Sequence, residues 1–294
     1  MGLLKKMIEG YDEQKAIEIL SDKDYWQDVI RAEQNKLIMQ EPLFGIETHD
    51  DIPCAVCYIG NIKGLIPIIE FGPIQHGRVN TLEDLKDPKK VEKTYQLMHS
   101  MTGQQIAFLV KGHDKKENIF TASRREALEW MKKRTEETLA VGSKTLAVIR
   151  NVTPVRAIAD IGGITATLSA AEYQHGWIED LTDHIMVGDH ISAQIIEYDK
   201  DKNRAVISRK VLLPDPWEDL GLVEQSVYIC EIAGVRQGGC YFRLKTQRGY
   251  VDGFLRHPRH EKLARGDKAL VKIINIDNSK RRIFAIYVRP LKIS

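Results

Sequence analysis

Aromatic and basic side chains alternate along one short stretch near the carboxyl end of the chain. Three such residues occupy every second position: Tyr241, Arg243 and Lys245. The positions between them are apolar: Cys240, Phe242 and Leu244. Successive side chains of an extended strand point to opposite sides. We therefore predict one apolar side that enters a core, and one side whose ring can stack on a planar base while its cations neutralise phosphates.

Further residues of the same kinds follow this stretch: Arg248, Tyr250, Arg256, His257, Arg259, Arg281 and Arg282. Residues 219–294 contain 15 Lys and Arg against 7 Asp and Glu, a net charge of +8, whereas the whole chain carries only +2. Such asymmetry indicates that this end of the chain meets a polyanion. The alternative is an ordinary exposed strand with a solvated basic surface.

A fixed spacing recurs along the chain and indicates repeated structural units. Gly103, Gly188 and Gly266 each precede a strand-like run, and an aspartate stands eleven residues after each glycine. Two of the three copies then read Ser123-Arg124 and Ser208-Arg209 at the same offset. An internal period of this kind is typical of a duplicated domain.

Each repeat has room for about five short strands joined by turns and one crossover, as in a small antiparallel barrel of the OB type. The predicted fold is mainly β, with three tandem five-stranded OB barrels, an N-terminal helical segment and short helical linkers. The expected domains follow the chain in this order: helical segment 1–37, repeat 38–127 with an inserted loop at 72–93, helical linker 128–139, repeat 140–213, and basic repeat 219–294.

Several motifs resemble the S1 family of bacterial ribosomal RNA-binding proteins, whose members are tandem OB repeats. They are GDHISAQIIEYD at 188–199 with ISRK at 207–210, VRAIADIGG at 155–163, PDPW at 214–217 and FTASRREAL at 120–128. The resemblance covers about residues 38–289. It implies that the repeats bind single-stranded RNA on a barrel face with two aromatics on the second and third strands, a histidine, and arginines on the last hairpin.

The resemblance carries over unequally to the three repeats. One aromatic position of the family falls on Val56, Ile158 and Tyr241, and the histidine position falls on Pro67, Ser169 and Arg256. Only the third repeat keeps an aromatic residue and a cation there, so it is expected to hold the main RNA face. The ends of the first two repeats supply secondary RNA-binding candidates: Arg124, Arg209 and Lys210.

Other patterns do not indicate chemistry. Cys54 and Cys57 stand three apart, so a regular strand would point their sulfurs to opposite sides, and no second cysteine pair has metal-ligand spacing. His257 and His260 each follow an arginine, Arg256 and Arg259, and are interpreted as part of a basic surface rather than as metal ligands. We expect no metal, no cofactor and no catalysis. Trp177, beside His175, is either an exposed stacking residue or a plug of a barrel end, and the plug is favoured.

The sequence thus predicts a non-enzymatic protein that binds single-stranded RNA, with messenger RNA as the leading candidate, in translation or RNA metabolism. The acidic first two repeats would contact a protein, the ribosome among the candidates. The few cysteines and the absence of a long apolar run favour the cytoplasm and no membrane. The alternative function is a protein-interaction scaffold of OB barrels that has lost RNA binding.

Overall fold

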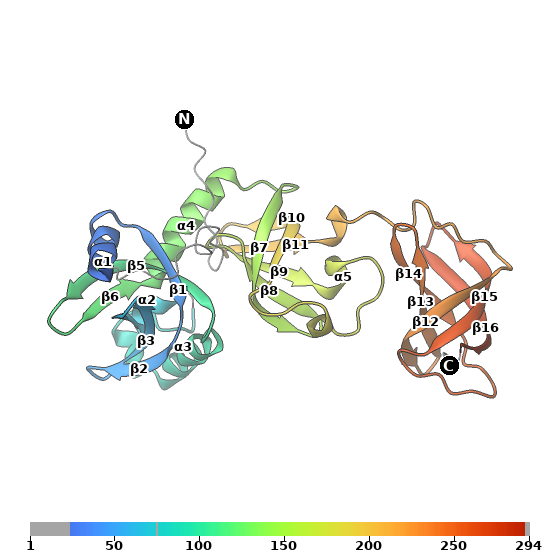
Figure 1. Cartoon of the computed structure of the whole chain (residues 1–294), viewed down its shortest axis with the longest axis horizontal. Helices are drawn as coiled ribbons and strands as arrows, with labels where there is room; N and C mark the ends of the chain where they lie inside the picture. Colours follow the sequence, from blue (N-terminus) through green and yellow to red (C-terminus); the bar gives the residue numbers. More distant parts are fainter. Residues whose placement is uncertain (1–23, 75, 292–294) are drawn as a thin grey trace. The chain divides into compact units, whose positions relative to one another are not determined.

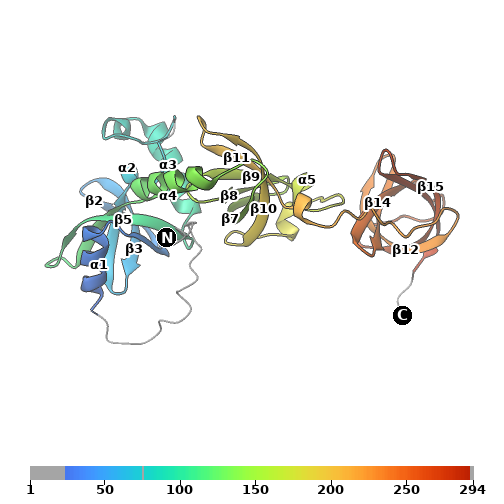
Figure 2. The ribbon, with the colours of Figure 1, turned by 90° about the horizontal axis from the view of Figure 1, so that it is seen from above.

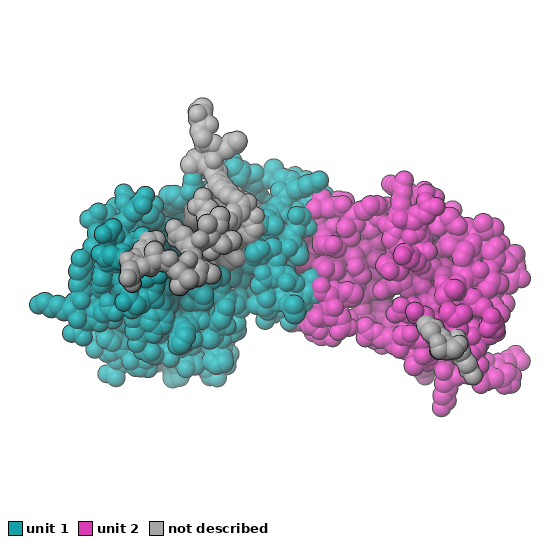
Figure 3. Space-filling model, in the orientation of Figure 1, with its two compact units in different colours: residues 1–152, 158–167, 185–206 teal, residues 153–157, 168–184, 207–294 magenta. Residues whose placement is uncertain are grey.

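The computed structural model describes residues 24–74 and 76–291, which form short strands with a few helices (Figure 1). The chain divides into two compact units (Figure 3). Unit 1 comprises residues 1–152, 158–167 and 185–206, and unit 2 comprises residues 153–157, 168–184 and 207–294.

The first repeat forms a sheet of six strands in the order β1-β5-β6-β4-β3-β2. Its strands are β1 (Ile38–Pro42), β2 (Gly45–His49), β3 (Ile52–Ile59), β4 (Ile62–Pro67), β5 (Gln105–Asp114) and β6 (Ile119–Ser123). The prediction of a five-stranded closed barrel is wrong for this repeat. The extended run breaks at Leu43 and Phe44, where the Leu43 N–H donates to the Gln104 carbonyl and the Phe44 N–H donates to the Val56 carbonyl. The break makes two edge strands, β1 and β2, out of one run.

The second and third repeats form closed five-stranded barrels, as predicted. The second contains β7 (Lys144–Thr153), β8 (Arg156–Asp160), β9 (Thr165–Ser169), β10 (His190–Asp199) and β11 (Arg204–Ser208). The third contains β12 (Val227–Arg236), β13 (Gly239–Thr246), β14 (Gly249–Leu255), β15 (Lys268–Asp277) and β16 (Arg282–Pro290), and its ring of strands is visible in Figure 2. Parallel pairing of β9 with β11 and of β14 with β16 joins the third strand of each barrel to its fifth.

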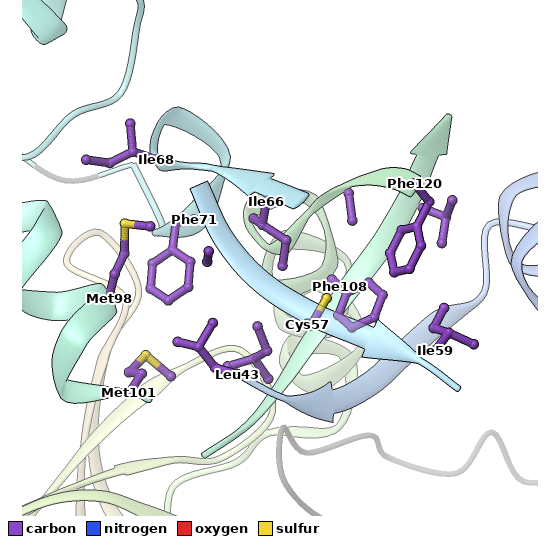
Figure 4. Close-up of a cluster of buried hydrophobic side chains, with 14 of the residues drawn as sticks. Leu43, Cys57, Ile59, Ile66, Ile68, Phe71, Met98, Met101, Phe108 and Phe120 are labelled. Atoms are coloured by element: carbon purple, nitrogen blue, oxygen red, sulfur yellow. The ribbon is translucent and has the colours of Figure 1, made fainter. Parts of the chain in front are cut away.

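A phenylalanine fills the core of the first repeat opposite Gly64, a glycine of β4. Phe108 and Phe120 stack there with centroids 5.8 Å apart, beside Cys57 and Ile59 (Figure 4). A Cβ at Gly64 would lie 2.2 Å from the Phe120 ring. In the third barrel the ring comes from the other neighbouring strand, because a Cβ at Gly253 of β14 would lie 2.2 Å from the ring of Phe242 in β13. Gly64 of β4 and Gly253 of β14 thus each make room for a buried ring.

Helices flank the first sheet and connect it to the second barrel. Among them α1 (Tyr25–Gln34) and α4 (Arg124–Thr138) both lie against β5 (Figure 2). Asp24 caps α1 and Ser123 caps α4 through side-chain oxygens that accept backbone N–H groups. The part of the predicted N-terminal helix before Asp24 lies outside the described residues. At its far end α4 is fixed by Thr135, whose hydroxyl donates to the Gly162 carbonyl at 2.7 Å.

Shorter helices lie between the strands: α2 (Ile68–Phe71), η1 (Glu83–Lys86), α3 (Pro88–Ser100), α5 (Ala170–Tyr173), η2 (Leu181–Asp183) and η3 (Lys210–Leu212). The loop predicted at 72–93 contains η1 and the first part of α3. Over residues 24–74 and 76–291, no helix is both long and apolar enough to span a membrane.

Candidate nucleic-acid interface

Three aromatic rings form a row across the outer face of the third barrel. Strand register places Tyr241 of β13 beside Phe254 of β14, and Phe254 beside Phe284 of β16. The ring centroids are 5.6 Å apart for Tyr241 and Phe254 and 6.5 Å apart for Phe254 and Phe284, both in edge-to-face geometry. Tyr241 is 39% exposed and Phe284 is 40% exposed. We call Tyr241, Phe254 and Phe284 the aromatic row.

Phe254 and Phe284 were missed as candidates from the sequence, although Tyr241 was found. A signal for both was present, because each alternates with buried neighbours: Gly253 and Leu255 flank Phe254, and Ile283 and Ala285 flank Phe284. Alternation alone does not reveal that the two rings are neighbours. That follows from the parallel pairing of β14 with β16, which joins residues thirty positions apart.

The outer side of β13 is partly engaged by other residues of unit 2. Trp177, in the segment between α5 and η2, stacks on Tyr241 with centroids 6.0 Å apart and an interplanar angle of 26°. The guanidinium of Arg243 donates to a carboxylate oxygen of Asp252 at 2.9 Å and also to the Trp177 carbonyl. Arg243 lies 6.0 Å from the ring centroid of Tyr250. This arginine is thus held in place rather than free on the surface.

The other predicted residues of the third repeat are exposed, and they differ in whether a partner holds them. Five of them have exposed side chains: Lys245, Tyr250, Arg256, Arg259 and Arg282. Two arginines are ion-paired: Arg248 with Glu218, and Arg281 with Asp215 at 2.6 Å. Although burial raises the pKa of Asp215, the Trp217 N–H and Arg281 lower it overall. The remaining residue is His257, whose Nε2 lies 2.8 Å from the Arg236 carbonyl oxygen.

A groove of ≈ 790 Å³ borders the aromatic row. Its lining includes the rings of Phe254 and Phe284, the side chains of Arg256, His257 and Arg259, and the acidic residue Glu261. Rings and arginines thus line the same groove, and such side chains can stack bases and neutralise the backbone of a single strand.

The Ser-Arg pairs at the ends of the first two repeats have a structural role that the sequence did not predict. In the first repeat, Ser123 donates to a carboxylate oxygen of Glu70 at 2.6 Å. The guanidinium of Arg124 donates to the Phe71 carbonyl at 3.0 Å and lies 5.0 Å from the centroid of the Phe71 ring. Arg124 is only 5% exposed. The pair therefore clamps α2 to the end of β6, and Arg124 lies inside the protein.

The second repeat builds the same clamp on α5. Ser208 donates to the Glu172 carbonyl at 3.4 Å, and Arg209 donates to the Tyr173 carbonyl at 3.3 Å with its guanidinium 4.7 Å from the Tyr173 ring centroid. Lys210 is paired with the Glu172 carboxylate at 3.0 Å. All three secondary candidates, Arg124, Arg209 and Lys210, thus bind protein groups of α2 or α5.

The third repeat has Ile286 and Tyr287 in place of Ser-Arg, and it has no helix after its third strand. There the Tyr287 hydroxyl donates to the Glu261 carboxylate. Loss of the signature therefore accompanies loss of the helix that it clamps.

In the first repeat, the surface equivalent to the aromatic row is aliphatic. Register pairs Val56 with Leu65, as it pairs Tyr241 with Phe254 in the third barrel. Val56 and Leu65 are buried in a small cluster with Cys54. No base-stacking ring stands at these two positions.

The cysteines are buried thiols, and the described residues contain no cluster of three metal-ligating side chains. Cys54 belongs to the outer cluster with Val56, whereas Cys57 belongs to the core of the first repeat, so their sulfurs point to opposite sides of β3. Burial raises the pKa of both thiols, and it raises the pKa of Cys230 to about 12. These thiols therefore remain protonated at neutral pH.

Residues 138–210 match the family of the S1 RNA binding domain. Small ribosomal subunit protein bS1 of Pseudomonas aeruginosa is 26% identical over 216 residues, which cover 68% of this chain and 37% of that protein. The bS1 protein of Coxiella burnetii is 26% identical over 199 residues, 61% of this chain and 35% of that protein. A 4-hydroxy-3-methylbut-2-enyl diphosphate reductase of Clostridium tetani is 26% identical over 240 residues, 75% of this chain and 36% of that protein.

The chain thus spans little more than a third of the length of these curated relatives. Among solved structures, GSP13 of Bacillus subtilis matches with a TM-score of 0.25 and 18% identity, over 29% of this chain and 73% of that chain. A multidomain protein with nucleic acid binding domains from Streptococcus pneumoniae matches with a TM-score of 0.20 and 12% identity, over 85% of this chain and 73% of that chain.

Proposed function

We propose that this chain, whose residues 138–210 belong to the S1 RNA-binding domain family, is a non-enzymatic RNA-binding protein whose third barrel is the main face for single-stranded RNA. The observation that carries the proposal is the aromatic row, in which Tyr241, Phe254 and Phe284 lie side by side on three strands. Every base has a π-face, so such a row accepts successive unpaired bases without requiring a sequence.

The charge around the row supports the same ligand. Residues 219–294 carry a net charge of +8, and Arg256, Arg259 and Arg282 are exposed near Phe254 and Phe284. These side chains would neutralise phosphates while the rings hold the bases. Binding by stacking and phosphate neutralisation gives little sequence preference and a strong dependence on salt.

Fluorescence anisotropy of a labelled oligouridine tests this function with the full chain. Because each neutralised phosphate of a single strand contributes a slope of about −0.7 in a plot of log affinity against log salt, three to five contacts should give a slope of about −2 to −3.5. A duplex of the same length is the control, since its bases cannot stack on the row. Absence of binding, or affinity that does not change with salt, would contradict the proposal.

The first two repeats lack rings at the equivalent positions, and we propose that they contact protein. Register places the aliphatic pair Val56 and Leu65 where the third barrel has Tyr241 and Phe254. Two of the curated relatives described above are ribosomal proteins, so the ribosome is the first candidate partner and messenger RNA the first candidate RNA. The full chain should cosediment with ribosomal subunits even when Tyr241 is replaced by alanine. Complete loss with that variant would show that RNA alone mediates the association.

A further inference from the structure

We propose that Trp177 is a built-in competitor of RNA: it covers Tyr241, and a base gains that end of the aromatic row only when Trp177 leaves. The inference rests on the proposed RNA-binding function of the row. Trp177 lies in the crossover segment of the second repeat, between α5 and η2, and belongs to the same compact unit as the third barrel (Figure 3).

The indole of Trp177 is enclosed on more than one side. It stacks on Tyr241 with ring centroids 6.0 Å apart and an interplanar angle of 26°, which is an offset-stacked arrangement. The guanidinium of Arg236 lies 5.4 Å from the Trp177 ring centroid. The ring also packs on Gly234, where an added Cβ would lie 2.8 Å from Trp177 Cζ3. A glycine at this point of β12 therefore lets the indole approach the barrel.

The main chain of Trp177 is bound as well as its ring. Its N–H donates to the Asp252 carboxylate, and its carbonyl accepts from Arg243. Asp252 and Arg243 are themselves paired across β13 and β14 at 2.9 Å. On a face that binds RNA, the Asp252 carboxylate would repel phosphates. Its position is explained by the Trp177 N–H, which donates a hydrogen bond to it. The pair thus holds a protein backbone from both sides.

Carboxylates of the same segment occupy arginines of the third barrel and its loops. Glu179 and Asp183 both pair with Arg265, at 3.3 Å and 3.0 Å. Glu179 also lies 4.0 Å from Arg236. The segment thus presents the same two kinds of group as a single-stranded RNA. The Trp177 ring on Tyr241 takes the place of a base, and the carboxylates of Glu179 and Asp183 take the place of phosphates.

Competition follows because the face of Tyr241 that holds the indole cannot also hold a base. The ion pairs of Glu179 and Asp183 with exposed arginines are screened by salt and contribute little. The segment is therefore held mainly by the indole and the two main-chain hydrogen bonds of Trp177, and none of these contacts is part of the strand pairing of the barrel, so the barrel stays folded when they break. The apparent affinity of the native chain for RNA is therefore the affinity of the undocked form multiplied by the fraction of chains in which Trp177 is undocked.

The experiment compares oligouridine binding by the native full chain with binding by two variants that release the indole in different ways. Trp177→Ala removes the ring, and Gly234→Ala keeps it but places a methyl group against it. The control is Trp130→Ala, which removes an exposed indole on α4 that lies beside Arg134. Circular dichroism checks that all chains are folded. Both release variants should bind RNA about three- to tenfold more tightly than the native chain, and Trp130→Ala should bind like it.

Each outcome decides the matter. Tighter binding by both release variants supports the proposal. Equal binding by all chains overturns it while leaving the proposed function intact, and weaker binding by Trp177→Ala overturns it by placing the indole in the RNA site. If none of the folded chains binds RNA, the proposed function fails and this inference fails with it.

Discussion

Replacing Tyr241, Phe254 and Phe284 together by leucine should weaken the binding of single-stranded RNA at least about 100-fold. Stacking contributes about 1–3 kcal/mol for each base, and one tenfold change in affinity corresponds to about 1.4 kcal/mol. Loss of three stacked bases therefore costs about 3 kcal/mol at the lower end of that range, which corresponds to about two tenfold steps. The measurement is anisotropy of a labelled oligouridine at fixed salt.

Leucine is chosen because it separates stacking from folding. The three side chains point away from the barrel core, and leucine keeps an apolar contact across neighbouring strands while it removes the π-face. The matched control replaces Phe44 and Tyr58, an edge-to-face pair on the first repeat, by leucine. The control should bind RNA like the native chain. A row variant that binds within about threefold of the native chain would exclude the row as the RNA face.

Arg124→Ala should lower the free energy of unfolding by about 3 kcal/mol, because it deletes a buried guanidinium that bonds a carbonyl and packs on a ring. Arg209→Ala removes the same two contacts in the second repeat, but Arg209 is half-buried, and about 1 kcal/mol is expected there. Chemical denaturation followed by circular dichroism measures both losses.

RNA binding supplies the second readout for these arginines. Since the Arg124 side chain is buried and its guanidinium donates to the Phe71 carbonyl, Arg124→Ala should leave the affinity of the folded chain for oligouridine unchanged. Equal losses of unfolding free energy for Arg124→Ala and Arg209→Ala would contradict the expectation that the more buried arginine contributes more to stability. A large loss of RNA affinity in a folded Arg124→Ala chain would contradict this prediction and would indicate that Arg124 contributes to RNA binding.

Much of the fold could be predicted because it depends on local patterns. The recurring glycine, aspartate and Ser-Arg spacings predicted repeats with the strand content of OB barrels, and two closed barrels are present. The six-stranded first sheet could not be predicted in the same way. It depends on where the run Ile38–His49 changes hydrogen-bonding partner, from β5 to β3, and residues distant in sequence decide that point.

The Ser-Arg pairs show why a motif does not reveal its own use. Arginines at the end of a strand are equally suited to a phosphate and to a buried carbonyl. The aromatic ring that receives each guanidinium, Phe71 or Tyr173, lies 53 or 36 residues earlier in the chain. Only folding brings the ring and the arginine together, so their contact has no periodic signal in the sequence.

By itself the sequence determined the repeats, the β class, the basic third repeat and the outward side of Tyr241, because charge and strand alternation are properties of neighbouring residues. The tertiary structure alone decided that Phe254 and Phe284 continue the ring surface of Tyr241, that Arg124 is buried, and that Trp177 covers Tyr241. Each of these facts is a contact between residues far apart in the chain, and such contacts are set by barrel closure and packing.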